Sequence, residues 1–158
     1  MTKFQTEFMQ RAVDLSREGM QNDKGGPFGA VIVKDGQIIA EGYNLVTSSN
    51  DPTAHGEVVA IRRACEKLGT FQLTGCELYT SCEPCPMCLG AIYWARPSIV
   101  YYANSQADAA AIDFDDSFIY DELAVAHEDR SIPFIAVPND EAIKVFHDWQ
   151  AKVDRTRY

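Results

Sequence analysis

Apolar residues recur along the chain with two spacings, one typical of helices and one typical of strands. In the first twenty residues they fall at Phe4, Phe8, Ala12 and Leu15, with charged residues between them. This spacing predicts an amphipathic helix over roughly residues 3 to 20 and differs from the continuous apolar run of a secretion signal. No later segment is apolar for long enough to span a bilayer. We therefore expect a cytoplasmic protein without a membrane-spanning segment.

Four runs rich in β-branched and aromatic residues predict strands. They are FGAVIV at 28–33, QIIAEGYN at 37–44, ELYTS at 77–81 and SIVYYA at 98–103. The Asp35-Gly36 pair lies between the first two runs. This dipeptide favours a tight two-residue turn, so the first two strands are expected to form a hairpin.

Helical segments alternate with these strands. Helices are expected from Thr53 or His55 to Gly69, from about Pro86 to Ala95, and from Asn139 onward. Glycine at the end of the first of these suits a left-handed C-cap. The acidic stretch ADAAAIDFDDSFIYDEL predicts a mixture of loop and short helix. Helices interleaved with strands argue for an α/β sandwich.

Length and charge limit the number of domains and the kind of partner. With 158 residues, 46% of them hydrophobic, it is long enough for one domain with a core and too short for two ordinary ones. We therefore expect a single domain over residues 1–158. The 14 basic residues against 23 acidic ones give a formal net charge of −9. Neutralising a phosphate backbone requires clustered Lys and Arg, so a nucleic-acid partner is disfavoured.

The five cysteines fall into two groups. Their odd number and the cytosolic setting argue against a disulfide framework, and Cys65, Cys76 and Cys82 are interpreted as small packed apolar residues. Cys85 and Cys88 differ from these because residues three apart lie on one face of a helical turn. At a helix N-terminus the dipole lowers the pKa of a thiol, as a divalent-metal site requires.

The candidate ligands number three. Pro86 suits the first position of a helix with Cys85 as its cap, and His55 also stands at an expected helix start, so ligands from two helix ends can converge. The other histidines, His127 and His147, do not have a ligand-like spacing. A structural zinc takes four protein ligands, whereas a catalytic zinc takes three and keeps a position for water. The count therefore indicates an open, catalytic site.

Glu57 lies two residues after His55 and is the natural partner of that water. A carboxylate held near the metal without binding it can take a proton from water and deliver it elsewhere. Two alternatives remain at this point: a structural zinc module, which needs a fourth ligand, and a thiol redox protein, which needs neither His55 nor Glu57. The order His-x-Glu followed by Pro-Cys-x-x-Cys is the signature of zinc nucleobase deaminases.

The chain resembles the cytidine and deoxycytidylate deaminase fold family and, within it, the short zinc-dependent guanine deaminases of bacteria. The segments that carry this likeness span nearly the whole chain: GGPFGAVIVKDG, Asn44, SNDPTAHGEV, LYTSCEPCPMCLGAIYWARP, FDDSFIY and the terminal Tyr158. PCPMCLGAI is shared with transfer-RNA adenosine deaminases and does not set the substrate. FDDSFIY and the terminal tyrosine are more discriminating.

The resemblance implies a three-layer α/β/α sandwich, with a mixed central sheet of about five strands and flanking helices. It also implies one zinc ion per subunit, bound by His55, Cys85 and Cys88, and hydrolysis of guanine to xanthine and ammonia. Glu57 would protonate ring N3, and backbone N–H groups at Cys85 would steady the developing tetrahedral centre.

Substrate recognition is assigned by the resemblance, because the residues alone leave alternatives. Asn44 reads equally well as a turn residue, and Asp116 as one more charge in an acidic loop. The resemblance implies that Asn44 contacts the O6 and N7 edge of the purine, and that Asp116 accepts from the 2-amino group and helps protonate the leaving nitrogen. The other residues with an implied substrate contact are Phe28, Ala54, Trp94, Phe114 and Tyr158.

A homodimer is also implied, in which the C-terminal segment, about residues 139–158, crosses to the other subunit. Tyr158 would then complete the pocket of a neighbour. The sequence leaves open whether the substrate is guanine, guanosine, ammeline or another aminated heterocycle, cytosine or cytidine, or adenine in transfer RNA. It also leaves open iron in place of zinc.

Overall fold

The computed structural model describes residues 4–158. The chain divides after Asp116 into two compact units, the second being Ser117–Tyr158, and each is described by itself. The first unit contains α1 (Thr6–Gln21), β1 (Gly29–Lys34), β2 (Gln37–Tyr43), α2 (Val46–Ser49), α3 (Gly56–Leu68), β3 (Cys76–Cys82), α4 (Pro86–Ala95), β4 (Ile99–Asn104) and α5 (Gln106–Ala110).

One mixed sheet forms the centre of the first unit. Its strands lie in the order β2-β1-β3-β4, with β1 antiparallel to both β2 and β3 and with β3 parallel to β4. The expected α/β fold with a mixed sheet is confirmed. The expected number of about five strands is wrong for the described residues, which form four. Each of the four matches an apolar run of the sequence, and the chain after β4 continues into the short helix α5. The later apolar run IPFIAV at 132–137 forms no strand, and its proline lacks the N–H that a strand ladder uses.

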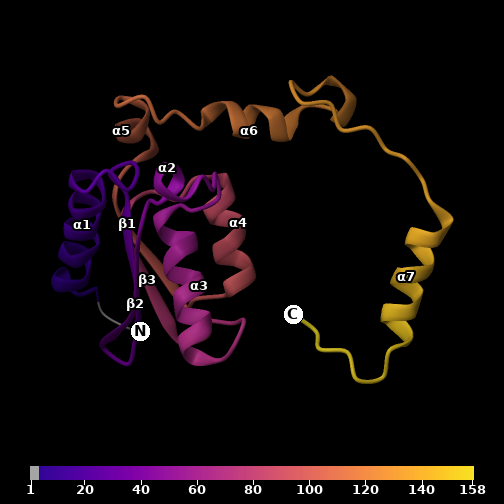
Figure 1. Cartoon of the computed structure of the whole chain (residues 1–158), viewed down its shortest axis with the longest axis horizontal. Coiled ribbons are helices and arrows are strands. Elements are labelled where there is room, and N and C mark those ends of the chain that lie inside the picture. Colours follow the sequence, from indigo (N-terminus) through magenta and orange to yellow (C-terminus); the bar gives the residue numbers. More distant parts are fainter. Residues whose placement is uncertain (1–3) are drawn as a thin grey trace. The chain divides into compact units, whose positions relative to one another are not determined.

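Helices cover both faces of this sheet, with α1 on one side and α3 and α4 on the other (Figure 1). Strand residues alternate between the two faces because the side-chain period of a strand is two. Val31, Val33 and Tyr79 pack with Phe8, Ala12 and Leu15 of α1, whereas Ala30, Ile32 and Leu78 pack with Ala60 and Ala64 of α3 and Ile92 of α4. The first unit therefore has the expected three layers and two buried cores.

Two element boundaries lie where local sequence signals predicted them. Asp35 and Gly36 have φ angles of 51° and 73°, so the expected tight hairpin turn is confirmed between Lys34 and Gln37, which pair across it. Gly69 ends α3 with φ 63°, as a left-handed C-cap.

The first helix begins later than predicted. Residue 3 lies outside the described residues, and Phe4 and Gln5 precede α1. Phe4 instead packs its ring near Tyr101, with the centroids 5.5 Å apart. The short helix α2 was not predicted, because its four residues, VTSS, are too few to show a helical period.

The second unit contains α6 (Ser117–Ala124), the 3-10 turn η1 (His127–Asp129) and α7 (Asp140–Ala151). The last helix begins as predicted, with Asn139 as its cap accepting a hydrogen bond from the Ala142 N–H at 3.0 Å. None of residues 117–158 is buried. Within residues 4–158, no helix has both the length and the apolar character needed to cross a bilayer.

Candidate metal centre and substrate cavity

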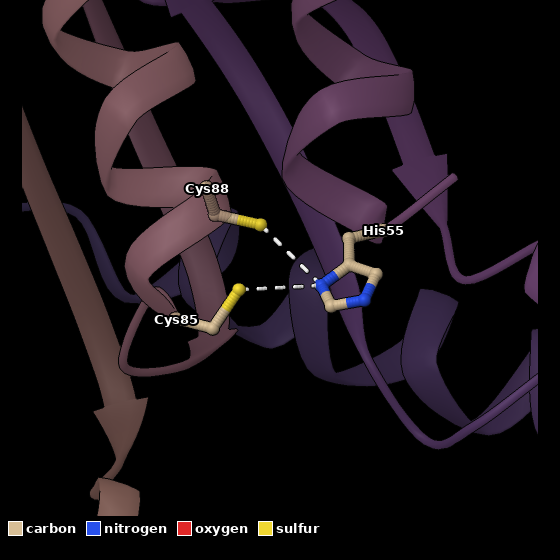
Figure 2. A group of neighbouring side chains, drawn as sticks. All are labelled: His55, Cys85 and Cys88. Atoms are coloured by element: carbon tan, nitrogen blue, oxygen red, sulfur yellow. Dashed lines mark hydrogen bonds between the residues drawn. The ribbon is translucent and has the colours of Figure 1, made fainter. Parts of the chain in front are cut away.

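Two helix starts bring three metal-ligand side chains together. His55 caps α3, Cys85 caps α4 with Pro86 as the first helical residue, and Cys88 lies one turn into α4. Figure 2 shows the imidazole ring pointing from one helix end toward the two sulfur atoms on the other. The ligands from two helix ends therefore converge, as expected from the sequence.

The distances between these side chains fit zinc. The Sγ atoms of Cys85 and Cys88 each lie 3.5 Å from Nδ1 of His55, and the ligand atoms of all three residues lie within 4.8 Å of one another. A tetrahedral zinc with bonds of about 2.0 Å to nitrogen and about 2.3 Å to sulfur separates these atoms by about 3.5 Å. Two thiol sulfurs and one imidazole are also the donor types that zinc prefers.

The two thiols differ in how readily they lose a proton. A hydrogen bond from Cys88, helped by His55, lowers the pKa of Cys85 to about 4. The same pairing, together with burial, raises the pKa of Cys88. The contact with Cys85 in turn raises the pKa of His55. The two sulfurs thus share a proton that metal binding releases.

Glu57 lies in the first turn of α3 and is 6% exposed. Its Oε1 accepts a hydrogen bond from the Thr80 hydroxyl at 3.2 Å, and its Oε2 lies 3.4 Å from Sγ of Cys88. Burial raises the pKa of the Glu57 carboxyl. The carboxyl is therefore fixed beside the ligand cluster without being one of the three ligands. The sequence analysis missed Thr80, because its contact with Glu57 depends on how β3 packs against α3.

A cavity of about 410 Å³ opens beside these groups, a volume within the range of roughly 300–1,000 Å³ typical of small-molecule sites. Most of the residues predicted from the sequence line it: Phe28, Asn44, His55, Glu57, Cys85, Phe114 and Asp116. These residues come from five separate stretches of the chain. The fold therefore joins the predicted metal ligands and the predicted substrate-binding groups in one place.

Asn44 is buried at the end of β2, 4% exposed. Its Oδ1 accepts a hydrogen bond from the Val46 N–H at 3.1 Å, which orients the amide as an Asx turn does. Gly25 lies so close that a Cβ there would be 2.2 Å from this oxygen. The turn role and the cavity position are thus compatible, since one end of the amide is fixed while the residue lines the cavity.

Phe28 and Phe114 form an aromatic wall. Their rings meet edge to face with centroids 4.9 Å apart. Gly26 allows this contact, because a Cβ there would lie 2.9 Å from the Phe114 ring and 3.1 Å from the Phe28 ring. Such a wall presents an apolar surface to a flat ligand.

Asp116 is half-buried at the cavity edge, and its Oδ1 accepts a hydrogen bond from Nε2 of Gln106 at 2.6 Å. Gln106 and Glu83 also line the cavity, and neither was predicted as a site residue. Two signals were present: Glu83 lies two residues before Cys85, and Ser105 with Asp108 forms a capping box that starts α5 at Gln106.

Four predicted residues are not among those lining the cavity: the ligand Cys88, and Ala54, Trp94 and Tyr158. Ala54 is buried, and its carbonyl accepts a hydrogen bond from the Leu45 N–H at 2.9 Å. Trp94 lies on α4 with 64% of its surface exposed. Tyr158 belongs to the second unit. Contacts of the last three residues with a substrate stay predictions.

Comparison with known proteins identifies the family. Residues 2–104 match the family model described as the cytidine and deoxycytidylate deaminase zinc-binding region. The chain is 60% identical over 151 residues to a guanine deaminase of Bacillus subtilis, covering 96% of this chain and 97% of that protein. It is 42% identical over 108 residues to a tRNA-specific adenosine deaminase of Agrobacterium fabrum, covering 68% of this chain and 70% of that protein.

The fold has a close relative among solved structures. The X-ray structure of guanine deaminase from Bacillus subtilis superimposes with a TM-score of 0.95 at 58% identity, covering 99% of each chain. The family match covers the His55, Cys85 and Cys88 cluster. The chain therefore belongs to the cytidine and deoxycytidylate deaminase family and binds the zinc of that family through these three residues.

Proposed function

We propose that this protein is a guanine deaminase, which hydrolyses guanine to xanthine and ammonia. The observation that carries the proposal is the extent of the likeness to the Bacillus subtilis enzyme, which covers 96% of the chain. It therefore continues well beyond the zinc-binding region at residues 2–104 and into the second unit. The likeness to the tRNA-specific adenosine deaminase covers only 68% of the chain.

Zinc, when bound, supplies the Lewis acidity that activates a water molecule at neutral pH. Glu57 then accepts the water's proton on its carboxylate and delivers it to N3 of the purine ring, while the water oxygen attacks C2. The buried position of Glu57 beside the ligand cluster supports this role. N–H groups at the start of α4, around Cys85, stabilise the negative charge that develops on the oxygen of the tetrahedral centre.

The remaining cavity groups bind and orient the base. Asn44 donates from its amide nitrogen to the edge that carries O6 and N7, because its oxygen is already held by Val46. Asp116 accepts from the 2-amino group, then takes the proton of the new C2 hydroxyl and passes it to the departing nitrogen, so that the C–N bond breaks, ammonia leaves and C2 becomes a carbonyl. Phe28 and Phe114 cover the flat purine, as their edge-to-face packing at the cavity wall supports.

The cavity lining favours an unphosphorylated substrate. Besides Glu57 it includes Glu83, Asp113, Asp115 and Asp116, whereas none of the described residues lining it is a lysine or arginine. A phosphate group near these carboxylates is repelled and finds no counter-ion. The free base is therefore preferred to its nucleotides, and the net charge of −9 opposes polynucleotides in the same way.

We further propose a homodimer in which the segment at about 139–158 crosses to the partner. The second unit carries large apolar side chains on its surface, and along α7 Ile143, Phe146 and Trp149 recur at three-residue spacing with 49%, 70% and 46% exposure. A helix of this length with an uncovered apolar stripe gains most of its stability from packing against another surface. A second copy of the chain supplies that surface, and Tyr158 then closes the partner's cavity.

All five cysteines of the chain are free thiols. This state fits a reducing compartment, in which thiols stay reduced, and we place the enzyme in the cytoplasm.

The test is ammonia release from a panel of purified substrates, with metal analysis of the same sample. The panel contains guanine, guanosine, guanosine monophosphate, cytidine, ammeline and transfer RNA. We expect guanine to be turned over fastest and zinc to be present at one ion per chain. Faster turnover of cytidine or of transfer RNA would overturn the assignment.

A further inference from the structure

We infer that Gln106 is a positioning residue of the active site: it fixes the Asp116 carboxylate so that one oxygen is presented to the 2-amino group of the substrate. This inference rests on the proposed function, because it refines the role given there to Asp116.

The contact between the two side chains is short and lies at the cavity. Nε2 of Gln106 donates to Oδ1 of Asp116 at 2.6 Å, and both residues line the cavity that contains Glu57 and the ligand His55. Because this bond uses Oδ1, we assign Oδ2 to the substrate. An amide that donates to one carboxylate oxygen restricts rotation of the whole group, since a carboxylate is planar.

Gln106 is itself held in place from the metal-binding loop. Its backbone N–H donates to Oε2 of Glu83 at 3.0 Å, and Glu83 stands two residues before the zinc ligand Cys85. The capping box of Ser105 and Asp108 fixes the start of α5 at the same point. Asp116 is thus connected to the zinc ligands through two hydrogen bonds and a short, capped helix.

A neutral donor suits this position. Asp113 and Asp115 line the same cavity, so three carboxylates gather at its edge and repel one another. Without a donor, the Asp116 side chain turns toward water and away from its neighbours. Glutamine supplies the donor without adding a charge, and its amide does not titrate.

The test begins with two substitutions. Q106L removes the donor at similar size, and Q106E replaces it with an acceptor that repels Asp116. We expect kcat/KM for guanine to fall about tenfold in Q106L, the size expected for losing a hydrogen bond to a charged group, and further in Q106E. Zinc content should stay at the wild-type level. The matched control is Q10E on α1, where Nε2 of Gln10 donates to Asp14 at 3.0 Å away from the cavity; its kinetics should equal wild type.

Inhibition by xanthine distinguishes loss of Asp116 positioning from general damage to the cavity. Xanthine carries an oxygen where guanine carries the 2-amino group, so its binding does not use the contact assigned to Asp116. In Q106L we expect the inhibition constant of xanthine to change less than twofold while kcat for guanine falls. Equal losses in both would mean that Gln106 merely supports the shape of the cavity, and the inference would be wrong.

A double-mutant cycle shows whether Gln106 acts through Asp116. If it does, Q106L has no further effect in the D116N background, because the group it orients is already changed. Additive losses would overturn the inference. Another outcome is that the wild type deaminates guanine, with D116N impaired and Q106L unchanged. That result would also overturn the inference, but it would leave the proposed function intact. If the wild type does not deaminate guanine, the proposed function itself has failed.

Discussion

The two units of this protein differ in what their own residues bury. Residues up to Asp116 hold two apolar cores on either side of a sheet, the metal-ligand cluster and a cavity. Residues 117–158 have no buried side chain, although they include large apolar residues such as Phe134, Phe146 and Trp149. The first unit can therefore be explained from its own contacts, whereas the second requires a surface that it does not itself supply.

The reactive groups and the segment proposed to cover them therefore belong to different units. The zinc ligands, and Glu57, which we propose moves protons, lie in the first unit at the N-terminal ends of α3 and α4. The second unit carries the tail that we propose closes the cavity of a partner. Under this proposal deamination requires both, because the groups must be held in place and bulk water must be excluded. The following predictions test that division, beginning with the largest effect.

Loss of the metal ligands or of Glu57 should have the greatest effect. His55→Ala, Cys85→Ala and Cys88→Ala should each lose zinc and activity together. Glu57→Gln should keep zinc, since Glu57 is not a ligand, but should lower turnover about 10²–10⁴-fold, as removal of a general acid-base group does. Metal analysis and ammonia release measure the two properties separately. Full zinc retention in the Cys85 variant would contradict the ligand assignment.

Removing the tail should give the next largest effect. Deletion of residues 155–158 should leave folding and zinc content intact, because the cores and the ligand cluster lie in the first unit. Guanine turnover should nevertheless collapse if Tyr158 closes the cavity.

Subunit mixing then tests whether the tail acts on a neighbour. Truncated chains combined with full-length Glu57→Gln chains, under conditions of subunit exchange, should regain part of the activity. Each truncated site would then be closed by an intact tail from its partner. Wild-type kinetics in the truncated enzyme would dismiss the lid, and inactive mixtures with proven exchange would confine the tail to its own subunit.

Apolar truncations should affect the two units differently. Leu78→Ala in the buried core should lower the free energy of unfolding by about 2–5 kcal/mol at every protein concentration. Phe146→Ala on α7 should cost less than about 0.5 kcal/mol in the dilute, monomeric protein, because this side chain is exposed there. At high concentration the loss should grow, since the partner buries the stripe. Thermal unfolding at several concentrations measures this, and a concentration-independent effect would argue against the dimer.

The smallest effect concerns an ion pair on the first unit. Arg11 contacts both oxygens of Glu41 at 2.7 and 2.8 Å, and this contact lowers the pKa of Glu41. A lowered folded-state pKa contributes stability above the unfolded-state pKa and loses it as the pH falls through the folded-state value. Glu41→Gln should therefore cost less than about 1 kcal/mol at pH 7, because both groups are partly exposed. The difference from wild type should shrink as the pH falls below the ordinary glutamate pKa of about 4.3, as followed by urea unfolding.

The sequence by itself determined the features that depend on neighbouring residues. The pairs His55 with Glu57 and Cys85 with Cys88 indicated a zinc deaminase because their spacing at helix starts is a local property. The Asp35-Gly36 turn and the Gly69 cap were predicted for the same reason, since a positive φ angle depends on the residue itself.

Only the tertiary structure decided which distant residues meet. Thr80 reaches Glu57, and Gln106 reaches both Glu83 and Asp116, across separations of 10 to 23 residues that carry no period in the sequence. These contacts follow from the register of the strands and the packing of α3 and α5, which depend on the whole core. The sequence thus specified the reactive groups, and the fold specified their burial, their partners and the cavity they share, because burial and contact are properties of the packed chain.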